Sequence, residues 1–176
     1  VQIQRFSRKP IQEDWKNQDY KTFAKTGDIY CLFYEKGHRL LRNSGVLAFI
    51  TSNKWMRAAY GQKLRGFLSQ MTQPLMLIDF SSFHVFSSAI VDTNVLIFRK
   101  EKFSKAITAC LVDKTFKQNS SLNNFVKKRS IQLNDLSADT WIICGRENHD
   151  IKKQIEAMGI PLKFSGFEIL YGIKTG

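Results

Sequence analysis

A helix–turn–strand unit between residues 27 and 51 constrains the fold of this chain more than any other feature. Residues 46–51, VLAFIT, are almost continuously apolar, as is typical of a strand buried on both faces. The Asn43-Ser44-Gly45 turn before it suits a left-handed helix end. The preceding segment places apolar residues at helical spacing, which predicts one helix face packed on a sheet. These residues are Ile29, Leu32, Phe33, Leu40 and Leu41.

Both ends of this unit carry polar residues with predicted roles. Asp28 is expected to cap the helix, because a carboxylate there accepts hydrogen bonds from unpaired backbone N–H groups. Residues 52–55, Ser-Asn-Lys-Trp, follow the strand at its carboxyl end, where open α/β sheets bind ligands. This loop is therefore a candidate site, although a Trp at the position of Trp55 is more often simply a lid over the edge of the core.

The next segment predicts the other half of the sheet. An amphipathic helix over 60–71 ends before Pro74, and strands are expected over 75–80 and 94–99. The connection over 81–91 has no helical pattern, so we expect the last strand to return antiparallel in a hairpin-like pair that ends the sheet. Phe83 and Phe86 in this connection are either hydrophobic plugs or, if exposed, surfaces on which a base can stack.

Weaker patterns predict the remaining elements. A short helix is compatible with residues 11–20, further strands with 106–112 and 140–144, and a helix with 149–158. Residues 118–124 are expected to form a mobile surface loop. The predicted fold class is α/β, with three strands from the end of a Rossmann-like sheet, the last one antiparallel, flanked by helices.

The charge balance points to a polyanionic partner. The chain has 27 Lys and Arg residues against 15 Asp and Glu, a formal net charge of +12. Such an excess favours nucleic acid as the first candidate partner, although many basic domains never bind one.

The cysteines and the hydropathy restrict the classes of protein to which the chain can belong. Cys31, Cys110 and Cys144 are odd in number and form no C-x-x-C pair, so we expect buried thiols in a reducing cytoplasm and no metal site. No apolar run reaches the length of a membrane span. The chain begins at Val1 and stops at Gly176 within an unfinished motif, which suggests an excised piece of a longer protein.

The order of these pieces resembles the γ-type N6-adenine DNA methyltransferases, and especially the restriction-modification proteins that join such a domain to a target recognition domain. The motifs that carry the resemblance are Asp28-Ile29-Tyr30, the helix with Phe33, the VLAFIT strand, Asn53-Lys54-Trp55, the Leu64-Arg65 helix, Val85-Phe86 before NVLIF, Trp141, the helix over 151–158, Pro161-Leu162 and Tyr171-Gly-Ile-Lys-Thr-Gly.

The resemblance implies transfer of a methyl group from S-adenosylmethionine to an adenine flipped out of double-stranded DNA. By resemblance, Phe33 packs on the adenine of the cofactor, whereas its spacing favours a core residue. Phe86 matches the aromatic residue that meets the flipped adenine, with Phe83 as its rival. Lys54 is expected to bind the DNA substrate together with Phe86.

The sequence also departs from this family. It contains neither the Gly-rich cofactor loop nor the Asn-Pro-Pro-Tyr motif, so no catalytic residue is assigned, and Ser52 replaces a proline common in relatives. We therefore expect an inactive fragment that does not bind S-adenosylmethionine tightly. Its expected parts are residues 1–112 of the methyltransferase domain, a basic connector over 113–165, and the start of a recognition domain over 166–176.

Two further expectations follow. The strand over 46–51 would have an unpaired edge, which predicts self-association. The alternative functions are a non-catalytic basic nucleic-acid-binding module and an S-adenosylmethionine-dependent methyltransferase that acts on RNA or protein.

Overall fold

The computed structural model describes residues 14–81, 83–86, 91–117, 119–134, 136–144, 146–160 and 164–166. Along the chain the elements are α2 (Tyr30–Leu40), β1 (Val46–Ser52), η1 (Lys54–Met56), η2 (Ala59–Gly61), α3 (Gln62–Met71), β2 (Gln73–Asp79), β3 (Thr93–Arg99), β4 (Ile107–Leu111), α4 (Leu122–Arg129), β5 (Ile131–Leu133) and α5 (Arg146–Met158). Residues 1–13 and 167–176 lie outside the described residues, and with them most of the predicted recognition-domain start.

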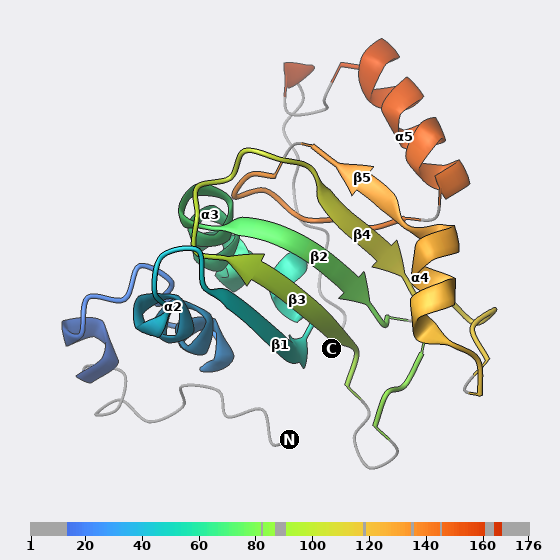
Figure 1. Cartoon of the computed structure of the whole chain (residues 1–176). Helices are drawn as coiled ribbons and strands as arrows, with labels where there is room; N and C mark the ends of the chain where they lie inside the picture. The colour runs from blue at the N-terminus through green and yellow to red at the C-terminus, as the bar shows by residue number, and fades with distance from the viewer. Residues whose placement is uncertain are drawn as a thin grey trace, which may run out of the picture.

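The strands form one mixed sheet of five strands in the order β1-β3-β2-β4-β5 (Figure 1). β3 runs antiparallel to both β1 and β2, which confirms the predicted antiparallel return. The sheet does not end with this pair, however. β4 continues it by pairing parallel with β2, and β5 pairs antiparallel with β4, because residues 100–106 carry the chain from the end of β3 across to the free side of β2.

Helices α2 and α3 pack on one face of the sheet, and α4 packs on the other. The main core lies on one face and combines residues of α2 and α3 with Leu77, Leu96 and Ile107 from the strands. A second cluster on the other face joins Ile78 and Cys110 to Val126 of α4. In Figure 1, α2 lies beside the β1 edge and α4 beside the end of β4, at the opposite side of the sheet.

The prediction that β1 is buried on both faces is wrong for the described chain. Val46 and Ile50 are 48% and 45% exposed, and Leu47 and Phe49 on the other face are only half-buried. β1 is the first strand of the sheet, so β3 is its one partner among the described residues. The apolar sequence therefore lies at an open edge with one apolar face uncovered.

Helix α2 differs from its predicted form at both ends and along its face. Its N-cap is Ile29, and no side chain caps it, so Asp28 does not have the predicted role. The buried side chains include Tyr34, Glu35 and His38, whereas Phe33 is exposed. The helix ends at Leu40, and Ser44 takes the left-handed conformation in the turn that follows, with φ of 60°.

Gly37 lets α2 approach β1 closely. A Cβ atom added there would lie 2.8 Å from Cδ2 of Leu47, inside normal contact distance. The glycine weakens helix propensity by about 1 kcal/mol relative to alanine. Its place in the sequence is therefore explained by packing between the helix and the strand.

The boundaries of two further elements differ from the predicted ones. The helical segment over 60–71 begins as the 3₁₀ turn η2 and becomes α3 at Gln62. Pro74 belongs to β2, paired with Phe98 beside a register shift, because a bulge accommodates a residue without an N–H group.

The carboxyl-terminal third adds irregular segments to the same core. Residues 140–144 form no strand, contrary to prediction, but the Trp141 N–H donates to the Met56 carbonyl at 2.9 Å. The Trp141 ring packs edge-on against Trp55, with centroids 5.2 Å apart. The predicted loop over 118–124 contains the start of α4, whose N-cap Ser121 accepts from the Asn124 N–H. The predicted helix over 149–158 is present as α5.

Two of the three thiols are buried as predicted, whereas Cys144 is only half-buried. Cys31 and Cys110 are buried, and burial raises the pKa of Cys31 to about 12 and that of Cys110 to about 11. Both thiols are therefore protonated at neutral pH. In the part of the chain that the structure describes, no helix has the length and apolarity needed to cross a membrane.

Candidate functional site at the carboxyl ends of β1 and β2

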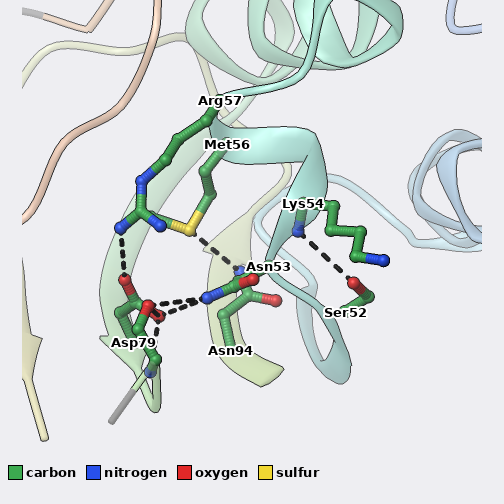
Figure 2. Close-up of polar contacts among 8 residues, drawn as sticks. Ser52, Asn53, Lys54, Met56, Arg57, Asp79 and Asn94 are labelled. Carbon is green, nitrogen blue, oxygen red and sulfur yellow. Dashed lines mark hydrogen bonds and ion pairs between the residues drawn. The ribbon is translucent and has the colours of Figure 1, made fainter. Parts of the chain in front are cut away.

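Polar side chains gather where β1 and β2 end and β3 begins. Ser52 and Asn53 close β1, Asp79 closes β2, and Asn94 lies near the start of β3. Because β3 runs antiparallel to both neighbours, the carboxyl ends of β1 and β2 lie at the same edge. All four residues are buried. Figure 2 shows the side chains of Asn53 and Asp79 pointing toward one another below η1, with Asn94 beside them, whereas Ser52 Oγ accepts from the Lys54 backbone N–H.

Asp79 is the centre of this cluster. Its carboxylate is fully buried, and its Oδ1 accepts from Asn53 Nδ2 at 2.7 Å and from Ser81 Oγ and N at 2.7 Å and 3.1 Å. Its Oδ2 accepts from Arg57 Nη2 at 3.2 Å. A buried carboxylate is costly unless it is paired and hydrogen-bonded, and these contacts supply both conditions. Asp79 therefore acts as an anchor for the surrounding chain.

Asn53 connects the two ends of the loop over 81–92. Its side-chain Nδ2 donates to Ser81 Oγ at 2.8 Å, at the start of that loop. Its backbone N–H donates to the Asp92 carbonyl at 3.0 Å, at the end of the loop. One residue of the β1 loop thus fixes both anchor points of the segment that carries Phe83 and Phe86.

A second polar network lies beneath this one. In register, Asn94 faces Thr51 on one side and Asp79 on the other. The Asn94 amide lies 3.0 Å from the Thr51 hydroxyl, which lies 2.9 Å from the Tyr34 hydroxyl. Burial raises the pKa of Tyr34, so its hydroxyl stays protonated. The network ties α2 to the strand ends that form the site.

Trp55 belongs to the core beneath the loop. It is completely buried, and its Nε1–H points to the Asn94 amide oxygen at 3.5 Å. Arg65 of α3 holds the surrounding turn by donating to the carbonyls of Trp55, Ala58 and Ala138. The lid interpretation of Trp55 is therefore the correct one.

The predicted site residues have different surroundings. Lys54 is exposed, and Figure 2 shows its side chain extending away from Asp79. Phe86 is 39% exposed, whereas Phe83 is half-buried with its ring 5.1 Å from that of Phe116. Phe33 is 48% exposed, so the interpretation as a core residue is wrong. Lys54 and Phe86 lie on the two segments that Asn53 connects, and Phe33 lies on α2.

Sequence reasoning missed Asp79 and Arg57. Asp79 had a recognisable signal, since it is the only charged residue within an apolar strand and stands at the carboxyl end, where sites form. Arg57 had none, because its pairing with Asp79 spans 22 positions. Among the described residues, no group of three or more His, Cys, Asp or Glu side chains is placed to hold a metal ion.

The mixed sheet and its flanking helices form an α/β fold similar to that of a solved methyltransferase structure. A Listeria monocytogenes protein assigned to the class I S-adenosylmethionine-dependent methyltransferases superposes with a TM-score of 0.50 at 19% identity, over 61% of this chain and 34% of that one. This likeness concerns the fold alone. The M protein of the type I restriction enzyme EcoKI superposes with a TM-score of 0.45 at 13% identity, over 58% of this chain and 25% of that one.

Sequence comparison is more specific. Residues 1–86 match the family model of the Eco57I restriction-modification methylase. The chain is 28% identical over 144 residues to the type II restriction enzyme and methyltransferase RM.Eco57I of Escherichia coli. The resemblance to restriction-modification methyltransferases is thereby confirmed. The match covers 81% of this chain and 14% of RM.Eco57I, so the chain spans a small part of the length of this curated relative.

Proposed function

We propose that this chain is the carboxyl-terminal part of the methyltransferase domain of an N6-adenine DNA methyltransferase from a restriction-modification system. The full-length protein would transfer a methyl group from S-adenosylmethionine to an adenine flipped out of double-stranded DNA. The observation that carries the proposal is the exposed Phe86 ring on a loop anchored at the ligand edge of the sheet. The match to a restriction-modification methylase model over residues 1–86 supports it.

Phe86 is the residue we assign to the flipped base. An exposed aromatic ring is unfavourably hydrated in the free protein. Stacking of a base on such a ring contributes about 1–3 kcal/mol to binding. Phe83 fits this role less well, because Phe116 already covers its ring. Flipping costs a few kcal/mol, so a stacking partner at this position offsets part of that cost.

Lys54 is assigned to the DNA backbone. Its side chain is exposed at the same edge, and no ion pair ties it to a described residue. An ammonium group there can neutralise a phosphate, which positions the duplex without reading its sequence. The net charge of +12 is consistent with such a partner.

Phe33 is the residue of this chain that fits the cofactor. Its exposed ring suits packing on the adenine of S-adenosylmethionine, which supplies the methyl group when it is bound. The fit is limited to this one ring, because the Gly-rich loop that cradles the cofactor is missing from the sequence. We therefore propose that this chain alone binds the cofactor weakly and is inactive, and that the catalytic residues lie elsewhere in the full-length protein.

The experiment is a methyl-transfer assay with the full-length protein on double-stranded DNA that contains adenine, using labelled S-adenosylmethionine. Phe86→Ala should weaken DNA binding about 5- to 150-fold, the equivalent of the stacking energy of about 1–3 kcal/mol, with cofactor affinity nearly unchanged. Phe33→Ala should do the reverse. If both variants only lower the thermal midpoint, the two rings are structural and the site assignment is wrong.

The same assay tests the leading alternative. A non-catalytic nucleic-acid-binding module would bind DNA in a strongly salt-dependent way, without any response to the cofactor. Salt-dependent binding without methyl transfer to adenine by the full-length protein would favour this alternative over the proposed function.

A further inference from the structure

A row of aromatic rings connects the Phe86 loop to helix α4. Phe83, at the base of that loop, meets Phe116 with ring centroids 5.1 Å apart, and Phe116 meets Phe125 of α4 at 5.2 Å. Both contacts are edge-on, an arrangement that aromatic pairs prefer. The rings pack against the second apolar cluster, between Phe80 at the end of β2 and Val126 on α4. The helix is therefore attached to the base of the loop, as Figure 1 shows for the two segments.

Basic side chains surround this attachment. Residues 113–130 contain five basic residues and one acidic residue, Asp113. The acidic residue is engaged locally, because its carboxylate accepts from Thr115 and lies 3.8 Å from Arg129. The remaining basic residues are exposed, and none forms an ion pair with a described residue. They are Lys114, Lys117, Lys127 and Lys128.

Helix stability explains only part of this pattern. Lysines in the last turn of a helix interact favourably with its dipole, which accounts for Lys127 and Lys128. Lys114 and Lys117 precede the helix, so this explanation does not apply to them. Four exposed ammonium groups that form no ion pair with a described residue are suited to binding a polyanion, and the Phe86 loop is the functional element to which their segment is packed.

We propose that these four lysines form a surface that binds the DNA phosphates flanking the flipped adenine. The inference rests on the proposed function, because that function supplies the polyanionic partner. The aromatic row would hold this surface at a fixed position relative to Phe86. Phosphate contacts of this kind would set the position and orientation of the duplex while Phe86 meets the base.

The test measures the salt dependence of DNA binding by the full-length protein. Two double variants, Lys127→Gln with Lys128→Gln and Lys114→Gln with Lys117→Gln, remove two charges each and keep helix-compatible side chains. The matched control is Lys36→Gln with Arg42→Gln, two exposed charges in and just after α2, beside the opposite edge of the sheet. Affinity for a short duplex is measured by fluorescence anisotropy from low to high salt.

Each phosphate contact contributes about 0.9 to the slope of log affinity against log salt concentration. We expect each lysine double variant to lower the slope by about 1–2, equally on duplexes of different sequence, and the control to leave it unchanged. An unchanged slope in both lysine variants, or an equal fall in the control, would overturn the proposal. Unaltered thermal midpoints confirm that the variants are folded.

The methyl-transfer assay separates this inference from the proposed function. If wild-type protein methylates adenine but the lysine variants keep its salt slope, the surface is wrong and the function stands. If the slope falls as expected without any methyl transfer, the lysines bind DNA phosphates and the enzymatic proposal fails.

Discussion

The side-chain amide of Asn53 donates a 2.7 Å hydrogen bond to the fully buried carboxylate of Asp79. The two residues are 26 positions apart, at the ends of β1 and β2. The same amide reaches Ser81, so the contact couples the loop after β1 to the loop that carries Phe86. Removal of this amide should therefore affect stability and DNA handling together.

Asn53→Ala leaves the Asp79 carboxylate buried with one donor fewer. We expect the free energy of unfolding to fall by about 1–3 kcal/mol, the cost of an unsatisfied buried polar group. In the full-length protein, DNA binding should weaken while cofactor affinity changes little. Urea denaturation and anisotropy measure these effects. Asn43→Ala, at an exposed turn position, is the control, and equal losses in both variants would contradict the coupling.

Two glycines give opposite predictions for the same substitution. A Cβ atom at Gly61 would lie 1.9 Å from the Trp55 carbonyl oxygen, so Gly61→Ala must displace the backbone between η1 and α3. We expect a loss of about 3 kcal/mol, at the upper end of overpacking costs. At Gly66, within α3, the nearest atom is the Ala138 Cβ at 3.5 Å. Gly66→Ala should stabilise by about 0.5–1 kcal/mol through helix propensity. Thermal unfolding distinguishes the two, and similar midpoints would refute the steric argument.

Substitutions of Phe83 and Phe86 should have different effects on folding stability and on DNA binding. Phe83→Ala removes the first ring of the row that ends at Phe125, so the free energy of unfolding should fall by about 1–3 kcal/mol. Phe86→Ala removes a more exposed ring and should change stability by less than about 0.5 kcal/mol. Chemical denaturation of both variants provides the comparison. A larger loss for Phe86→Ala would show that its ring is structural.

His38 should make stability depend on pH. Its Nε2–H donates to the Met71 carbonyl at 3.1 Å, and burial, followed by the nearby Lys100, lowers the pKa of the ring. Folding therefore favours the neutral ring, and this contribution is complete above the unfolded pKa of about 6.5. As the pH falls below that value, the unfolded chain binds a proton first and stability decreases.

The variant His38→Gln isolates this effect, because the glutamine amide does not titrate but can still donate a hydrogen bond to the Met71 carbonyl. Between pH 8 and pH 5.5 the wild-type thermal midpoint should fall further than that of the variant. Carboxylates contribute equally to both proteins, so the difference reports the histidine. Parallel falls would mean that His38 does not carry the pH dependence.

The edge of β1 should make the 176-residue chain self-associate. β1 exposes Val46 and Ile50 beside an edge that no described strand covers, and such edges recruit other chains. Analytical ultracentrifugation should show concentration-dependent association that Ile50→Lys reduces. Leu40→Lys, at a 74% exposed position on α2, should leave it unchanged. A monomer at all concentrations would dismiss the prediction.

Local patterns in the sequence determined most of the elements. The spacing of apolar residues placed α2, β1, α3, β2 and β3 within a few residues of their positions. The short connection over 81–92 also predicted the antiparallel direction of β3, because a parallel crossover needs more chain. These features depend on neighbouring residues, so they can be read from a single sequence.

Helix faces and strand coverage were less predictable. Phe33 matched the apolar periodicity of α2 but is exposed, while the polar residues Glu35 and His38 are buried. Glu35 is buried because Thr22 and Arg39 satisfy its carboxylate. Periodicity records which side chains are apolar, and it does not record which polar groups find partners.

The sequence by itself determined the class of fold, the edge of the sheet where the candidate site lies, and the residue types available there. Only the tertiary structure decided that Asn53, Arg57 and Ser81 meet at Asp79, and that Phe86 rather than Phe83 is the more exposed ring. The physical reason is distance along the chain: a buried carboxylate selects its partners by proximity in space, and strand order brings together residues that no local pattern connects.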